Sequence, residues 1–273
     1  MSLRVNTNTM AFNAYRNLSA TDTAIGKSLE KLSSGLRINR AGDDASGLVI
    51  SENLRSQIGG LKQAVRNAQD GISVVQTAEG ALTEVHSMLQ RMRDLAIQAA
   101  NTGSNGGATS TAVAAAQAEV NQLVSAIDDI AARTQFNGTS LLSGAGSLTF
   151  QVGANSGETL SLSTTGMGAS ALGITGLSLG TAATAISSLD AAISSVSAQR
   201  GVFGAAQNRL EHAIANLNVT AENLAASESR IRDTDMAQEM TEFSKSQILM
   251  QAGTAMLAQA NQAPQQVLSL LQG

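Results

Sequence analysis

Apolar residues recur at intervals of three, four or seven positions along most of the chain, and this spacing predicts α-helices. The N-terminal segment carries such a stripe at Leu18, Ile25, Leu29, Leu32 and Leu36. The stripe ends in the sequence SSGLRINRAGDDASG, where three glycines among polar side chains indicate a break or an extended loop. We therefore expect a first helix that ends in this segment.

A second run extends from about residue 45 to residue 100. Its apolar positions alternate by four and three as Leu54, Ile58, Leu61, Val65, Ala68, Ile72 and Val75, slip in phase near Leu82, and resume as Val85, Leu89, Met92, Ala96 and Ala99. No proline interrupts these residues, so one helix would reach about 84 Å. A compact globule of this chain length has a radius of gyration of about 18 Å. The pattern therefore predicts an elongated rod.

Turn-forming residues then separate this run from a third helix. Asn101–Gly107 is a cluster of such residues, and Thr109, Ser110 and Thr111 are candidate caps. Val113, Val120 and Ile127 repeat by seven, as do Ala116, Leu123 and Ile130. This repeat predicts a seam that packs against the long second helix.

The pattern changes between residues 136 and 188. Leu148, Phe150 and Val152 alternate with polar residues, as do Leu160 and Leu162 after a turn at Asn155–Gly157, which predicts a β-hairpin. The Gly/Ser/Thr-rich residues 164–182 are expected to be a surface loop.

Helical spacing returns near the C-terminus. One stripe begins at Leu189 and ends near Leu224, and the chain breaks or bends around residues 229–235. A last stripe is formed by Met236, Met240, Phe243, Met250 and Leu257 and runs to Pro264, the only proline. The predicted fold class is mainly α: an elongated rod of long, coiled-coil-like helices with a small β-hairpin region in the middle of the chain.

Composition limits how such helices pack. The chain of 273 residues contains six aromatic residues, no cysteine and only 14% charged residues, yet 43% of its residues are hydrophobic. Disorder is not expected at this hydrophobicity, so narrow seams of small and aliphatic side chains must supply the core. The lack of cysteine excludes disulfides and thiolate sites. A net charge of −4 gives no signature of nucleic-acid binding, and the first residues lack the apolar stretch of a secretory signal.

The two ends of the chain carry opposite charge. Residues 1–40 hold an excess of basic side chains and residues 228–273 an excess of acidic ones, which favours pairing of the terminal helices. Residues 246–273 contain no charged side chain, but eight Gln and Asn residues interrupt them, so we expect no membrane span. A neutral helix whose glutamines bond to other copies of the chain fits better and predicts self-assembly.

Candidate chemistry is sparse. His86 and His212 stand alone inside predicted helices, and neither begins a zinc-binding motif. Gly26-Lys27-Ser28 resembles the end of a phosphate-binding loop, but Thr21 occupies the position of the first glycine. We expect no catalytic residues, no cofactor and no metal, and therefore no enzyme.

Several long segments resemble bacterial flagellin in the order that the family has them. They are VNTNTMAFNAYRNL, LEKLSSGLRINRAGDDASGLVISENL and RTQFNGTSLL near the start, and RGVFGAAQNRLEHAIANL, SRIRDTDMAQEM and ILMQAGTAMLAQANQAPQQVLSLL near the end. The resemblance covers residues 1 to about 142 and about 189 to 273, so this is a short form without large outer variable domains. It implies a structural subunit that polymerises into the flagellar filament for motility.

The resemblance also implies a division of the chain. Residues 1–40 with 235–273 would form an inner coiled coil in the filament core, and residues 41–234 an outer rod that includes the hairpin and surface loop at 136–188. The filament-packing residues would be Leu18, Ile25, Leu29, Leu32, Met236, Met240, Phe243, Met250 and Leu257. The alternatives are a hook–filament junction protein of the flagellum and a flagellin-like cell-surface protein.

Partners and location follow from the same resemblance. They are many copies of the chain itself, a flagellar export chaperone, the filament cap and junction proteins, with export through the flagellar secretion channel and no cleaved signal peptide. The protein would be extracellular, in the filament. A Toll-like innate immune receptor would contact Leu89, Arg91, Leu95 and Glu119.

Overall fold

The computed structural model describes residues 7–101 and 110–271, with side chains described as far as residue 262. The chain divides into two compact units, Met1–Ser56 with Asn223–Gly273, and Gln57–Glu222. We call them the terminal unit and the central unit. The turn expected at Asn101–Gly107 falls almost wholly outside the described residues.

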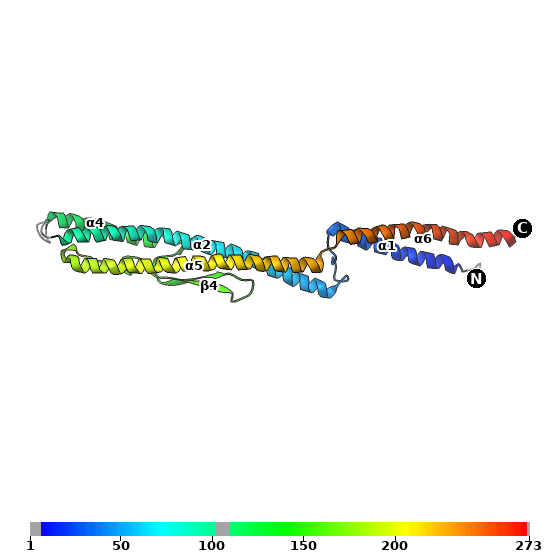
Figure 1. The fold of residues 1–273 in the computed structure, drawn as a ribbon, viewed down its shortest axis with the longest axis horizontal. Helices are drawn as coiled ribbons and strands as arrows, with labels where there is room; N and C mark the ends of the chain where they lie inside the picture. Colours follow the sequence, from blue (N-terminus) through cyan, green and yellow to red (C-terminus); the bar gives the residue numbers. More distant parts are fainter. Residues whose placement is uncertain (1–6, 102–109, 272–273) are drawn as a thin grey trace. The chain divides into compact units, whose positions relative to one another are not determined.

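Helices dominate both units (Figure 1). They are α1 (Thr9–Ser34), α2 (Ala45–Ala100), α4 (Thr111–Arg133), α5 (Ala182–Arg232) and α6 (Met236–Leu271), with a short 3₁₀ helix η1 (Leu179–Thr181). The strands are β1 (Gln135–Phe136), β2 (Thr139–Ser140), β3 (Gly146–Gln151) and β4 (Thr159–Thr164). The mainly α fold with a β-hairpin in mid-chain is confirmed.

In the central unit, α2, α4 and α5 lie side by side and share a seven-residue repeat (Figure 1). Buried positions follow one another by three and four along α2 as Leu61, Ala64, Ala68, Gly71, Val75, Ala78, Leu82, Val85, Leu89, Met92, Ala96 and Ala99. The same spacing occurs on α5, from Ala185 to Leu210. A sustained seven-residue repeat is the packing rule of left-handed coiled coils.

The phase slip expected near Leu82 is therefore wrong. The stripe of α2 passes through Leu82 without interruption, because Ala64, Gly71 and Ala78 occupy contact positions. A Cβ added to Gly71 would lie 3.2 Å from Leu210 Cδ1 and 3.3 Å from Phe150 Cδ1. Small residues allow the packed elements to approach closely at these positions, but they do not stand out in a pattern of large apolar side chains.

The predicted hairpin is confirmed as β3 and β4, which pair antiparallel from Gly146↔Thr164 to Gln151↔Thr159. Its turn contains Gly157, with φ of 89°. The inward face of β4 buries Leu160 and Leu162. Asn67 on α2 donates a hydrogen bond from Nδ2 to the carbonyl of Gln151 at 3.1 Å, so the hairpin is tied to the helix by its end.

The segment expected to be a surface loop is instead substantially buried. Met167, Ala169, Leu172, Ile174 and Leu179 all belong to the main core cluster. Polar side chains of the helices bind this segment: Gln117 bonds the carbonyl of Leu177 and the amide of Leu179, Asp128 accepts from the amide of Ala169, and Gln199 accepts from Thr165 Oγ1. Gln117 and Asp128 thereby satisfy backbone groups that burial would otherwise leave unpaired.

In the terminal unit, α1 and α6 pair antiparallel (Figure 1). A short antiparallel bridge joins Leu36 and Asp233, and Arg37 binds the carbonyl of Ile231 through its guanidinium. Arg232 forms an ion pair with Glu52 on α2. These contacts lie where the sequence predicted breaks between helices.

The last helix continues past the proline at which it was expected to end. Pro264 lies inside α6 and has no N–H to donate to the carbonyl of Ala260, four residues earlier. Asn8 occupies that carbonyl instead, because its Nδ2 donates to it at 2.7 Å. The Oδ1 of the same side chain accepts from the amide of Ala11 at 3.0 Å and caps α1.

Candidate assembly surface

The pairing of α1 and α6 uses one narrow stripe on each helix. On α1 the stripe consists of Ala11, Ala14, Leu18, Thr21, Ile25, Ser28 and Leu32, with the half-buried Glu30 and Lys31 beside it, and on α6 it consists of Glu239, Phe243, Ser246, Met250, Gly253, Leu257 and Ala260. Both sets follow intervals of three and four. Six of the nine predicted filament-packing residues are on these stripes: Leu18, Ile25, Leu32, Phe243, Met250 and Leu257.

Most of these seam residues are only half-buried. A Cβ on Gly253 would lie 3.3 Å from Leu18 Cδ1, so the helices approach closely there. Lys31 and Glu239 form an ion pair across the seam at 3.4 Å, as the opposite charges of the chain ends predicted. The predicted pairing of the terminal helices is confirmed.

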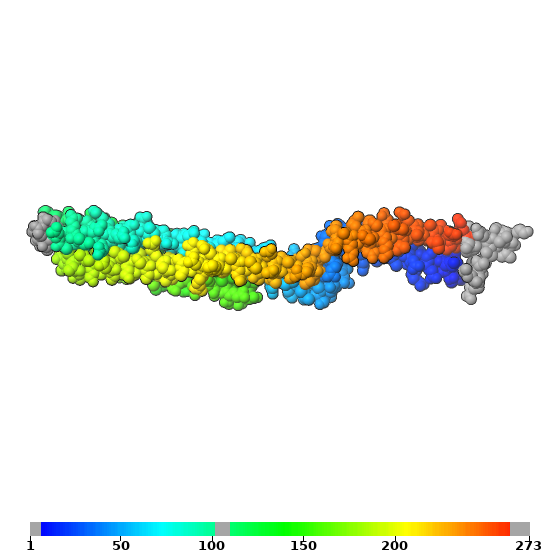
Figure 2. All heavy atoms as spheres, in the orientation of Figure 1, coloured from blue at the N-terminus to red at the C-terminus, as the bar shows by residue number. Residues whose placement is uncertain are grey.

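Large hydrophobic side chains cover the outside of this unit. The remaining three predicted packing residues, Leu29, Met236 and Met240, are about half exposed. Other large hydrophobic side chains, outside the predicted set, are also about half exposed or more: Met10, Phe12, Tyr15, Val49, Ile50, Ile248, Leu249 and Met256. Among the described residues of the terminal unit, Ile38 is the single buried hydrophobic side chain. In the space-filling view, α6 (orange) and α1 (blue) lie side by side with no further element over the face shown (Figure 2).

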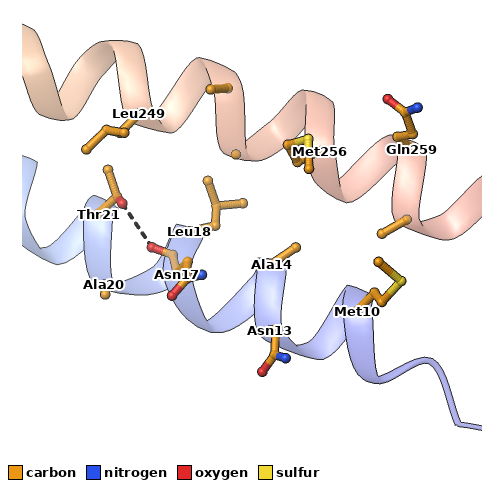
Figure 3. A pocket seen from close by; sticks show the side chains of 13 residues that line it. Met10, Asn13, Ala14, Asn17, Leu18, Ala20, Thr21, Leu249, Met256 and Gln259 are labelled. Atoms are coloured by element: carbon orange, nitrogen blue, oxygen red, sulfur yellow. Dashed lines mark hydrogen bonds between the residues drawn. The ribbon is translucent and has the colours of Figure 1, made fainter. Parts of the chain in front are cut away.

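An open groove of about 910 Å³ runs between the two helices (Figure 3). Met10, Ala14 and Leu18 line it from α1, and Leu249 and Met256 line it from α6. Leu18 points from α1 toward α6, and Met10 and Met256 come from opposite walls (Figure 3). The groove is mostly apolar, so it favours an apolar occupant over water.

Two of the six aromatic side chains lie outside this groove on α1. Phe12 and Tyr15 are each 64% exposed. Exposed aromatic residues are uncommon on isolated surfaces and enriched at the centres of protein interfaces. No charged side chain follows Lys245 in the sequence, so the second half of α6 presents no ionic group that burial would have to desolvate.

The residues predicted to contact an immune receptor lie in the central unit and divide into two kinds. Leu89 and Leu95 are buried in the core. Arg91 and Glu119 are exposed and form an ion pair at 2.8 Å between α2 and α4. The hydrogen bond that Arg91 donates to the carboxylate of Glu119 raises the pKa of Arg91 above its ordinary value. Arg91 and Glu119 are therefore the accessible members of this group.

Neither a metal site nor a membrane-spanning helix is found in the part of the chain that the structure describes. Residues 7–101 and 110–271 contain no group of three or more His, Cys, Asp or Glu side chains placed to hold a metal ion. Among the described helices, none combines the length and apolar character needed to cross a membrane.

Comparison with known proteins agrees with this architecture. The family model described as the bacterial flagellin N-terminal helical region matches residues 5–147, and the model of the flagellin C-terminal helical region matches residues 186–271. The chain belongs to the bacterial flagellin family. The two matched regions contain both terminal helices and nearly all of the long helices of the central unit. The stretch between them, residues 148–185, contains most of β3, all of β4, the buried connecting segment and the first residues of α5.

Curated flagellins are similar over nearly the whole chain. The flagellin of Bacillus subtilis (strain 168) is 49% identical over 98% of this chain and 100% of its own length. That of Halalkalibacterium halodurans is 52% identical over 98% of this chain and 99% of its own. The crystal structure of Bacillus cereus flagellin covers 60% of this chain and 94% of that chain, with 37% identity and a TM-score of 0.50. The chain is a flagellin, a structural subunit that polymerises into the flagellar filament, as predicted.

Proposed function

We propose that the terminal unit is the part of this flagellin that polymerises. In this proposal residues 1–40 with 235–273 form the inner coiled coil of the filament, and residues 41–234 form the outer rod, whose contacts set the register between subunits. The role is structural and uses no catalytic residue, cofactor or metal.

One observation carries this proposal: the terminal unit exposes eleven large hydrophobic side chains and buries one, Ile38, among its described residues. Complete burial of one such side chain contributes about 1.5–3 kcal/mol, so covering the exposed half of eleven gives roughly 8–16 kcal/mol. Association itself costs about 4–15 kcal/mol. Assembly should therefore need most of this surface, shared among several neighbouring copies.

The test uses full-length chains with the exposed aromatic pair removed. Phe12→Ala combined with Tyr15→Ala should raise the critical concentration for polymerisation by about a hundredfold, because two large side chains lose roughly 3 kcal/mol of burial. The measurement is sedimentation of salted-out protein, with electron microscopy to show long uniform tubes.

A matched control keeps the same helix and removes polar groups instead. Ser19→Ala and Thr23→Ala lie on α1 beside the aromatic pair and should change the critical concentration by less than about threefold, since surface substitutions act within about 0.5 kcal/mol. Equal effects of the two double variants would refute the assignment of this surface.

Deletion of residues 246–273 extends the test to α6. The truncated chain should keep the helices of the central unit, whose core lies within Gln57–Glu222, and should not form filaments. Efficient filament formation by the truncated chain would contradict the proposal.

We further propose the partners and location that the family resemblance implies. The subunit is extracellular in the filament, reaches it through the flagellar secretion channel without a cleaved signal peptide, and meets an export chaperone, the filament cap and junction proteins on the way. Support comes from family membership and from the apolar helix pair, which needs covering before assembly.

The proposed contact with a Toll-like receptor rests on the exposed pair Arg91 and Glu119. Arg91→Ala should lower receptor activation in a reporter-cell assay. Arg93→Ala is the matched control, because Arg93 lies two residues away on α2 and pairs with Asp190 at 2.7 Å instead. Equal responses to both variants and to the unchanged chain would refute the contact.

A further inference from the structure

Methionine side chains are distributed unequally between the two units. Among the described residues, four methionines are about half exposed or more, and all four lie on the terminal helices: Met10, Met236, Met240 and Met256. In the central unit Met92 and Met167 are buried. Because the chain contains no cysteine, methionine thioethers are its only sulfur atoms. A two-electron oxidant therefore meets reactive sulfur first on the terminal helices.

Two of these sulfur-bearing side chains share one site. Met10 extends into the groove from α1 and Met256 from α6, and they are 59% and 63% exposed (Figure 3). Met236 and Met240 lie one helical turn apart near the start of α6 and are 48% and 49% exposed. All four are on the surface that the proposed function assigns to assembly.

We propose that Met10, Met236, Met240 and Met256 form an oxidation site that controls the assembly of this flagellin, a proposal that rests on the proposed function of the terminal unit. Hydrogen peroxide is the oxidant. A sulfur lone pair attacks one peroxide oxygen, the O–O bond breaks, and that oxygen remains on sulfur as a sulfoxide while the other leaves as water. Sulfur loses two electrons and the peroxide gains them.

The sulfoxide changes what the surface can bury. A thioether is apolar and adapts its shape to a partner, whereas a sulfoxide is polar and must keep a hydrogen bond when it leaves water. Oxidised subunits therefore stay in solution. In an assembled filament the same four side chains are covered by neighbouring copies, so oxidation acts on free subunits and spares the polymer. Methionine sulfoxide reductases reverse the change.

The experiment treats the free full-length chain with hydrogen peroxide and maps sulfoxides by peptide mass spectrometry. We expect oxidation at the four exposed methionines before Met92 and Met167, with helical circular dichroism retained. The critical concentration for polymerisation should rise by about tenfold or more, since each buried sulfoxide opposes association. Treatment with both epimer-specific reductases should restore the original value. Filaments treated in the same way should remain unoxidised at Met10 and Met256.

Two sets of variants separate the exposed methionines from the buried ones. Replacing all four exposed methionines with leucine keeps side-chain volume nearly constant and should leave polymerisation resistant to peroxide. The matched control, Met92→Leu with Met167→Leu, should remain as sensitive as the unchanged chain. Sensitivity of the first variant, or resistance of the second, would overturn the proposal.

Untreated chains allow the assembly surface to be tested separately from the oxidation site. Polymerisation of untreated chains, together with unchanged polymerisation after all four methionines are oxidised, would overturn the oxidation site and leave the assembly surface intact. If Phe12→Ala with Tyr15→Ala polymerises as well as the unchanged chain, the assembly surface itself is refuted, and the oxidation site with it.

Discussion

The contact between Asn8 and Ala260 allows a quantitative prediction about the pairing of the chain ends. Asn8→Ala removes the cap of α1, which costs about 1 kcal/mol, and the bond to the Ala260 carbonyl, which costs about 1 kcal/mol more. If assembly requires paired helices, a loss of about 2 kcal/mol raises the critical concentration about thirtyfold.

Pro264 determines whether loss of the hydrogen bond from Asn8 to the Ala260 carbonyl costs free energy. In Pro264→Ala, residue 264 regains an N–H that can donate to Ala260, so the carbonyl keeps a partner when Asn8 is lost. In that background Asn8→Ala should cost only the cap, about 1 kcal/mol or roughly a fivefold change. The predicted coupling between the two sites is therefore about 1 kcal/mol.

Sedimentation of the two single variants, the double variant and the unchanged chain gives this coupling directly. Ser33→Ala is the control, because Ser33 also lies on α1, is exposed and does not line the groove. Additive effects of Asn8→Ala and Pro264→Ala, within about 0.3 kcal/mol, would refute the role assigned to the freed carbonyl.

Three further perturbations test the fold. Gly71→Ala should destabilise the central unit by about 1–3 kcal/mol through crowding, whereas Gly80→Ala, with no atom within 4 Å of its added Cβ, should stabilise it by up to about 1 kcal/mol in urea denaturation. Phe203→Ala should cost about 3–5 kcal/mol in the same assay, because Phe203 is fully buried. Asp43 accepts hydrogen bonds from the backbone amides of Arg40 and Asn39, and these bonds lower the pKa of its carboxyl below the ordinary value. The local stabilisation that they give is present above the pKa of the unfolded state and is lost as the pH falls through the pKa of the folded state. The protection factors of the amides of that loop, which correct for the intrinsic pH dependence of exchange, should then fall below about pH 4, and Asp43→Asn should remove this fall.

The helices were predictable because their seams repeat over many turns. Seven-residue spacing on α2 and α5 is long enough for a few ambiguous positions not to matter. The false phase slip at Leu82 arose where Ala64, Gly71 and Ala78 make the contacts, since small residues carry little apolar signal of their own. Their role depends on the side chains that they face. For Gly71 these side chains are Leu210 and Phe150, which are far away in the sequence.

The connecting segment after β4 shows a second limit. Its glycine and serine content is typical of exposed loops, but Met167, Ile174 and Leu179 are buried because Gln117, Asp128 and Gln199 satisfy the backbone around them. Amino-acid composition does not show which side chains bind the segment, nor how far from it in the sequence those side chains lie.

The assembly surface was predictable only in part. Helical spacing of apolar residues predicted Leu18 and Phe243, which pair the two helices within one chain, because residues with this spacing face a partner helix. Residues that await a partner outside the chain, such as Phe12 and Leu249, lie off that stripe. In the sequence these residues are visible only as large apolar residues in excess of the number that one helix–helix seam can bury.

The antiparallel pairing of α1 with α6 also orders events in time. A ribosome makes α1 first and α6 last, and the bond from Asn8 to Ala260 closes a separation of 252 residues. The contact stripe of α1 packs against α6, so it remains open until almost the whole chain has been synthesised. A chain that stops before α6 cannot present the paired surface. We expect this topology to act as a check on length, which withholds prematurely ended chains from the polymer.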